Sequence, residues 1–156
     1  MNRERIKELA CVLVLILFVC FLTKGASVSD KTAAEVFEKV SKSIDISMLK
    51  NCDKAKFQKE TDFSYEDFSE VIYYASDSVM EVREVMIIKL KPEDSAKEIM
   101  SALEERAEEK EKLFSGYAPE QSALLSEYVL EEKDGFVFFA VSENSEKALA
   151  AFKSAL

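Results

Sequence analysis

The stretch Tyr128–Val141, YVLEEKDGFVFFAV, decides the fold. Runs rich in β-branched and aromatic residues lie on both sides of Asp134-Gly135, a composition typical of strands. The dipeptide Asp-Gly is common in the two-residue turns that join antiparallel strands. The stretch therefore predicts a β-hairpin with strands over 128–133 and 136–141.

A second hairpin is predicted upstream. Val71–Ala75, VIYYA, and Glu81–Leu90, EVREVMIIKL, have the same strand-like composition, and the turn-like Ser76-Asp77-Ser78 lies between them. Tyr73 and Tyr74 point to opposite faces of their strand, because successive side chains alternate. We expect one of these rings in the core and the other exposed.

A long helix is predicted between the hairpins. Pro92 is placed at its start, and Ser115-Gly116 stops it after Phe114. Glu93 and Asp94 in its first turn complement the helix dipole. Apolar residues at helical spacing form one stripe, namely Ala96, Ile99, Met100, Leu103 and Ala107.

Shorter helices are predicted elsewhere. Thr32-Ala-Ala-Glu35 has the form of a capping box and predicts a helix over Lys31–Ser43. Asp53–Lys59 forms one or two helical turns with Phe57 inward. Tyr117–Gln121 opens a short helix through about Leu125, and a last helix is capped by Ser142 or Asn144. Two further segments are non-helical, an apolar link over Ile44–Leu49 and an acidic loop over Glu60–Asp67 that lacks the pattern of a calcium loop.

This order, α-ββα-ββα, predicts an α+β domain. Two strand–strand–helix units in succession favour a four-stranded antiparallel sheet made of two hairpins, with the helices packed on one face. The strand order is not specified by the sequence. We expect one hydrophobic cluster that contains Ile99, Leu103, Val85 or Ile87, Phe138 and Phe152.

An N-terminal hydrophobic helix is predicted over Leu9–Leu22, LACVLVLILFVCFL, which contains no charged residue, Gly or Pro. Its length lies between that of a cleaved secretory signal and that of a membrane-spanning helix, and both alternatives stay open. We favour an uncleaved signal anchor over residues 1–26, with secretion after signal cleavage as the alternative. Arg3, Arg5 and Lys7 place the N-terminus in the cytoplasm, so that the single domain over 27–156 lies outside a cell membrane that the chain crosses once.

The charge of the exported part limits its partners. Removing the three basic and two acidic residues before Leu9 leaves 18 Lys+Arg and 28 Asp+Glu, a net charge of −10. Nucleic acid is disfavoured, because binding to phosphates needs basic residues. The expected partners are the membrane, through Leu9–Leu22, and an envelope protein or wall polymer.

The residue types present exclude several kinds of chemistry. The chain has no His, which excludes Ser-His and Cys-His nucleophiles and imidazole zinc sites. Cys52 is the one cysteine after the N-terminal stretch, so the domain has no internal disulfide. With three Gly and no Gly-rich loop, we expect no nucleotide cofactor, and no spacing indicates a metal site.

Three residues are candidates for a binding surface. Glu84 stands at the start of a strand, and its other interpretation is a surface ion pair with Arg83 or Lys89. Tyr117 and Pro119 lie between two helices, where they line a contact site or simply form a turn whose ring covers the sheet edge.

The chain resembles the family known as domain of unknown function 4358, exported proteins of Gram-positive bacteria with a lipoprotein signal or an N-terminal membrane segment. The resemblance spans Thr32–Leu156 and rests on EVMIIK at Glu84–Lys89, the Ala/Glu/Lys helix after it, Tyr117-Ala118-Pro119, and Gly135 with the strand that follows. It implies no activity. A lipobox is absent from this sequence.

We therefore expect a non-enzymatic envelope protein whose exported domain binds a protein, wall polymer or small ligand. The alternative is a hydrolase that acts on cell-wall material with a pair of carboxylates.

Overall fold

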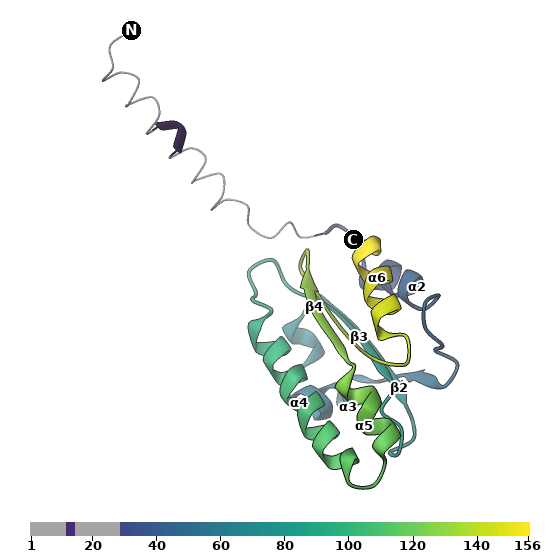
Figure 1. Cartoon of the computed structure of the whole chain (residues 1–156). Helices are drawn as coiled ribbons and strands as arrows, with labels where there is room; N and C mark the ends of the chain where they lie inside the picture. The colour runs from purple at the N-terminus through teal and green to yellow at the C-terminus, as the bar shows by residue number, and fades with distance from the viewer. Residues whose placement is uncertain (1–11, 15–28) are drawn as a thin grey trace.

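Both predicted hairpins are present, and they lie side by side in one antiparallel sheet (Figure 1). The computed structural model describes residues 12–14 and 29–156. The strands are β1 (Leu49–Asn51), β2 (Glu70–Ser76), β3 (Glu84–Lys89), β4 (Val129–Lys133) and β5 (Phe136–Val141). The helices are α2 (Ala33–Val40), α3 (Lys54–Thr61), the 3₁₀ turn η1 (Tyr65–Asp67), α4 (Lys97–Ser115), α5 (Pro119–Ser126) and α6 (Ser145–Ala155).

The sheet has the strand order β1-β2-β3-β5-β4, and every neighbouring pair is antiparallel. The two hairpins join through β3 and β5, where Glu84 pairs with Val141 and Lys89 with Phe136. At the β4–β5 turn Asp134 and Gly135 have φ of 50° and 80°, as a type I′ turn requires. The α+β class and both hairpins are therefore confirmed.

The predicted number of strands is wrong, because β1 adds a fifth. Leu49–Asn51 pairs with Tyr74–Ser76 at the edge of the sheet. The composition of Ile44–Leu49 predicts an apolar link instead, because a strand of three residues in which only Leu49 is buried shows no alternation of polar and apolar residues.

The prediction that the helices pack on one face is also wrong. Helices α2 and α6 cover one face of the sheet, and α3, α4 and α5 cover the other (Figure 1). Strands β3 and β5 are apolar along most of their length because both of their faces are buried, a pattern typical of strands between two helical layers.

The expected single cluster is accordingly split in two. Ile99 and Leu103 pack with the strand residues that face α4, such as Met86 and Phe139. The residues of the opposite face, including Val85, Ile87, Phe138 and Phe152, form a separate cluster with α2 and α6. Tyr74 lies on this second face, where its ring stacks on Phe37 at 4.5 Å and is only partly exposed, whereas Tyr73 is buried on the first.

The helix starts are partly as predicted. The capping box at Thr32 and Glu35 is present, whereas α5 begins at Pro119, two residues after Tyr117, where its opening segment is predicted to begin. Helix α4 begins at Lys97 and not at Pro92, because Pro92 lies in a turn in which the Asp94 N–H donates to the Lys91 carbonyl at 3.0 Å. The apolar stripe of α4 is confirmed.

The start of the described domain and the β2–β3 loop lie at opposite ends of the sheet. The Ser29 N–H donates to the Asp134 carbonyl at 2.9 Å, so the described domain begins beside the β4–β5 turn. The pairing of Glu84 with Val141 places the β2–β3 loop at the opposite end, next to the α4–α5 turn (Figure 1).

The predicted N-terminal hydrophobic helix over Leu9–Leu22 falls, apart from residues 12–14, outside the described residues. Within residues 12–14 and 29–156, no helix is both long enough and apolar enough to cross a bilayer.

Candidate binding site

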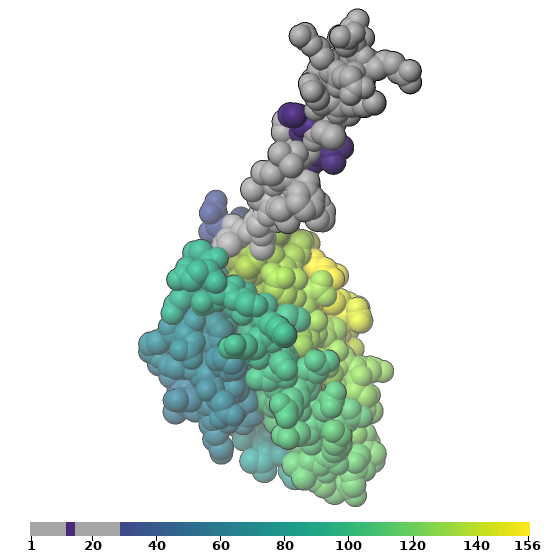
Figure 2. Space-filling model, turned by 90° about the vertical axis from the view of Figure 1, so that its left-hand side faces the viewer, coloured from purple at the N-terminus to yellow at the C-terminus, as the bar shows by residue number. Residues whose placement is uncertain are grey.

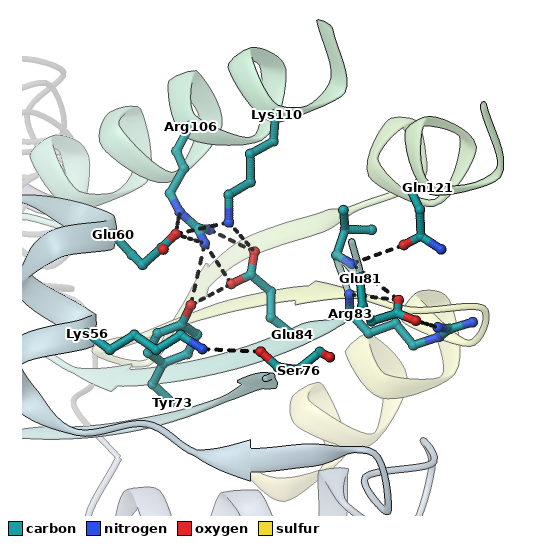
Figure 3. Close-up of polar contacts among 11 residues, drawn as sticks. Lys56, Glu60, Tyr73, Ser76, Glu81, Arg83, Glu84, Arg106, Lys110 and Gln121 are labelled. Carbon is teal, nitrogen blue, oxygen red and sulfur yellow. Dashed lines mark hydrogen bonds and ion pairs between the residues drawn. The ribbon is translucent and has the colours of Figure 1, made fainter. Parts of the chain in front are cut away.

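A cluster of charged side chains lies between the sheet and helices α3 and α4, centred on Arg106 (Figure 3). Arg106 donates through Nη1 and Nη2 to the two carboxylate oxygens of Glu84, each at 2.8 Å. It also donates through Nε and Nη2 to Oε2 of Glu60, at 2.9 and 2.6 Å. Side-chain exposure is 9% for Arg106 and 2% for Glu84, so this bidentate pair is buried.

Two more side chains complete the cluster. Lys110, one turn after Arg106, donates from Nζ to Glu60 Oε2 at 2.9 Å and lies 3.9 Å from Glu84 Oε1. The Tyr73 hydroxyl donates to Glu84 Oε2 at 2.9 Å. Two carboxylates thus face two cations, and the neutral cluster joins α3, α4, β2 and β3.

The local structure explains why these residues meet. Arg106 follows Leu103 by three positions and Ile99 by seven, so it lies on the apolar stripe of α4 that faces the sheet. Glu84 precedes Met86 and Ile88 by two and four positions on β3 and shares their face, which is the face toward α4. Arg106 is therefore held directly over the start of β3.

The cluster fixes the charge states of its members. Burial by itself raises the pKa of the Glu60 carboxyl, but the charge of Arg106 and hydrogen bonds from Lys110 and Arg106 outweigh burial and lower the pKa to about 2. The same balance of burial against the cations Arg106 and Lys110 lowers the pKa of Glu84. Burial and the neighbouring Glu84 raise the pKa of Tyr73. Both carboxyls are ionised at neutral pH, and the phenol is not.

An open cleft of 580 Å³ lies beside this cluster, between α3, the β2–β3 loop and the last turns of α4. Figure 2 looks onto the side of the molecule on which α4 lies beside α3. Glu60, Glu84 and Tyr73 contribute to the lining of the cleft, and Lys110 contributes from α4. Apolar side chains also line it, namely Val79, Val82, Leu113, Phe114 and Tyr117.

A family model described as Domain of unknown function (DUF4358) matches residues 42–142, more than half of the chain. The chain belongs to the DUF4358 family. The matched part of this DUF4358 protein contains all five strands and the whole Arg106 cluster, whereas α2 and α6 lie outside it. No curated protein and no solved structure matches the chain.

The three residues predicted for a binding surface, Glu84, Tyr117 and Pro119, have different surroundings in this DUF4358 protein. Glu84 is not in the predicted surface pair with Arg83 or Lys89, because it is buried against Arg106. Arg83 instead donates from Nε to the carboxylate of Glu143 at 2.9 Å, and Lys89 lies 3.8 Å from Glu70.

Tyr117 lines the cleft, with its side chain 51% exposed and its ring centroid 5.2 Å from that of Phe114. Pro119 is exposed at the start of α5 and is not among the residues that line the cleft. The structure therefore brings Glu84 and Tyr117 to one cleft and leaves Pro119 outside it.

Glu60, Arg106 and Lys110 are not among the site residues predicted from the sequence. The sequence predicts an acidic loop at Glu60, but this residue is in the last turn of α3. A signal for Arg106 was present, because a cation on the apolar stripe of a helix needs a buried partner. Among residues 12–14 and 29–156 no group of three or more Cys, Asp or Glu side chains is arranged to hold a metal ion.

Proposed function

We propose that this DUF4358 protein is a non-enzymatic component of the cell envelope, whose exported domain binds another envelope molecule in the cleft beside the Arg106 cluster. The observation that carries the proposal is the composition of this cleft. Exposed apolar side chains such as Leu113 and Tyr117 line it. The carboxylates of Glu60 and Glu84 also line it, and their charges are already neutralised by Arg106 and Lys110. Open apolar surface of this kind is typical of binding sites.

A carboxylate hydrolase is supported less well by the same cleft. Glu60 and Glu84 both contribute to its lining, but the general acid of a glycosidase must keep its proton near neutral pH, which requires a raised pKa. Here the pKa of both carboxyls is lowered, and both side chains are held by Arg106. Ion-paired carboxylates favour a structural role over acid–base catalysis.

The location proposed for the domain follows from the sequence. The apolar stretch Leu9–Leu22 anchors the chain in the cell membrane as a single span, and the basic residues before it keep the N-terminus in the cytoplasm. Secretion after signal cleavage is the alternative. In either case the cleft faces the outside, at the end of the domain opposite Ser29.

The proposal is tested by crosslinking in the native cell. A crosslinker that does not pass the membrane is added to intact cells, the chain is recovered through a C-terminal tag under denaturing conditions, and its adducts are identified. The expected result is an adduct with an envelope molecule. Absence of any envelope adduct, together with release of wall fragments by the purified chain and loss of that release in Glu60→Gln, would instead establish the hydrolase.

A further inference from the structure

Exposed apolar side chains are concentrated at one end of the domain. Within residues 29–156 five large apolar side chains are exposed, and four of them are on the β2–β3 loop or near the end of α4. Val79 is 88% exposed and Leu113 63%, and both line the cleft together with Tyr117. Met80 is next to Val79 on the same loop. Such a group of apolar side chains is typical of a protein contact surface.

The acidic side chains that line the cleft are all paired. Arg106 binds Glu60 and Glu84, as described above. Of the remaining acidic lining residues, Asp77 forms an ion pair with Lys50, and Glu81 shares Arg83 with Glu143, which is outside the lining. Each carboxylate in the lining therefore already has a cationic partner within the chain.

Two lysines of the lining have no such partner. Lys56 Nζ donates to the Ser76 carbonyl at 3.2 Å, and Lys59, one turn later on α3, is exposed. Neither forms an ion pair with a carboxylate of residues 12–14 or 29–156. Because Arg83 is shared by Glu81 and Glu143, the ion-paired groups at the cleft leave one negative charge, against two positive charges on Lys56 and Lys59. In a domain of strongly negative net charge, the cleft therefore keeps a net charge of +1, which favours a negatively charged partner.

The extent of the exposed apolar surface favours a protein segment over a small ligand as the binding partner. A cleft of 580 Å³ is of a size that holds a small molecule, but Val79 and Met80 extend the apolar surface along the β2–β3 loop. A small ligand in the cleft leaves this loop exposed, whereas a peptide segment covers it. The cleft is also at the end of the domain away from Ser29, where a second protein has access.

We infer that the cleft is a docking site for an acidic segment of a partner protein, whose carboxylates meet Lys56 and Lys59 and whose apolar side chains pack on Val79, Leu113 and Tyr117. This inference rests on the proposed function and specifies its partner. The contact combines charge steering with an apolar anchor, as protein interfaces do.

The test uses the full chain in its native cell, with a photo-crosslinking amino acid in place of Leu113, whose side chain is 63% exposed. A second chain carries the same group in place of Lys147, on α6 at the other face of the sheet. We expect position 113 to give an adduct with one protein and the attached partner peptide to be rich in Asp and Glu. Replacing those residues of the partner by Asn and Gln is expected to lower the yield about tenfold.

Charge variants of the chain test the role of the lysines. Lys56→Glu/Lys59→Glu is expected to lower the adduct yield at position 113 about tenfold. Lys59→Glu alone is also expected to lower this yield. Lys97→Glu/Lys147→Glu changes the net charge equally but away from the cleft, and its yield is expected to stay within about twofold of the unchanged chain. Lys59→Glu keeps the test valid if the double variant fails to fold, because the side chain of Lys59 forms no hydrogen bond or ion pair with residues 12–14 or 29–156.

Several results overturn the inference. They are an adduct of the chain with itself, an adduct with a glycan or lipid alone, a non-acidic partner peptide, and an equal loss of yield in both charge variants. If position 113 captures an envelope glycan, lipid or non-acidic protein, the proposed function stands and this inference fails. If position 113 captures no envelope molecule, both fail, whatever position 147 captures.

Discussion

Arg106 is the residue on which the buried charges depend. It is the bidentate partner of Glu84, whose side chain is only 2% exposed. Arg106→Met leaves this carboxylate buried with only Tyr73 and the more distant Lys110, so we expect a loss of about 3–5 kcal/mol in the free energy of unfolding. Urea unfolding at pH 7 measures it. Arg83→Met, which removes more exposed ion pairs, is the control and is expected to cost about 0–1 kcal/mol.

The loss in Arg106→Met is expected to shrink as the pH falls, because the lone Glu84 then takes up a proton and becomes neutral. Adding Glu84→Met to Arg106→Met is expected to recover much of the stability, since it removes the unpaired charge while Glu60 and Lys110 still pair. Equal stability losses for Arg106→Met and Arg83→Met would contradict the account of the cluster.

The pH dependence of stability tests the ion pairs of Glu60. Its pKa is lowered from 4.5 to about 2 in the folded state. A lowered pKa contributes stability that is fully present above pH 4.5 and is lost as the pH falls toward about 2. Glu60→Gln removes this contribution, so its unfolding free energy should lie below that of the unchanged chain at pH 7 and approach it near pH 2. Parallel curves would show that Glu60 is not stabilised by its partners.

The candidate site was only partly predictable at this scale. Glu84 and Tyr117 were identified, but the partner of Glu84 lies 22 positions away on another element. A single sequence gives no register between a strand and a helix, so it cannot pair Glu84 with Arg106. The position of Arg106 on the apolar stripe of α4 was the available signal.

Helix α4 provides a comparison of two leucines on one element. Leu103 is fully buried against the sheet, whereas Leu113 is 63% exposed at the cleft. Leu103→Ala is expected to cost about 2–5 kcal/mol, because it removes buried methyl groups and leaves a cavity. Leu113→Ala is expected to change stability by about 0.5 kcal/mol or less. Thermal or urea unfolding measures both, and similar losses in the two variants would mean that the packing of α4 is assigned incorrectly.

At the level of elements, local signals were sufficient where they were strong. Asp134-Gly135 fixed one hairpin, and the periodicity of Ile99, Leu103 and Ala107 fixed the inward face of α4. The two-sided helical cover was missed although the near-continuous apolar runs of β3 and β5 indicated it. Strand β1 was missed because its pairing with β2 is set by tertiary contacts and not by its own three residues.

The molecule as a whole contains two buried clusters on the two faces of one sheet. Its one cysteine among residues 29–156, Cys52, is free and buried. We therefore expect residues 29–156, expressed alone in a reducing cytoplasm, to give one cooperative unfolding transition whose midpoint is unchanged by chelator or reductant. A midpoint that falls on adding either reagent would mean that a metal or a disulfide completes the fold.

We propose that the domain works outside the cytoplasm, held by Leu9–Leu22. The most direct measurement is the addition of protease to intact protoplasts that carry the full chain with a C-terminal tag, with a cytoplasmic protein as the control for an unbroken membrane. We expect the tag and domain to be degraded, or lost to the medium if the signal is cleaved, while the cytoplasmic control survives. A domain that stays with the cells and resists protease until the membrane is broken would contradict this proposal.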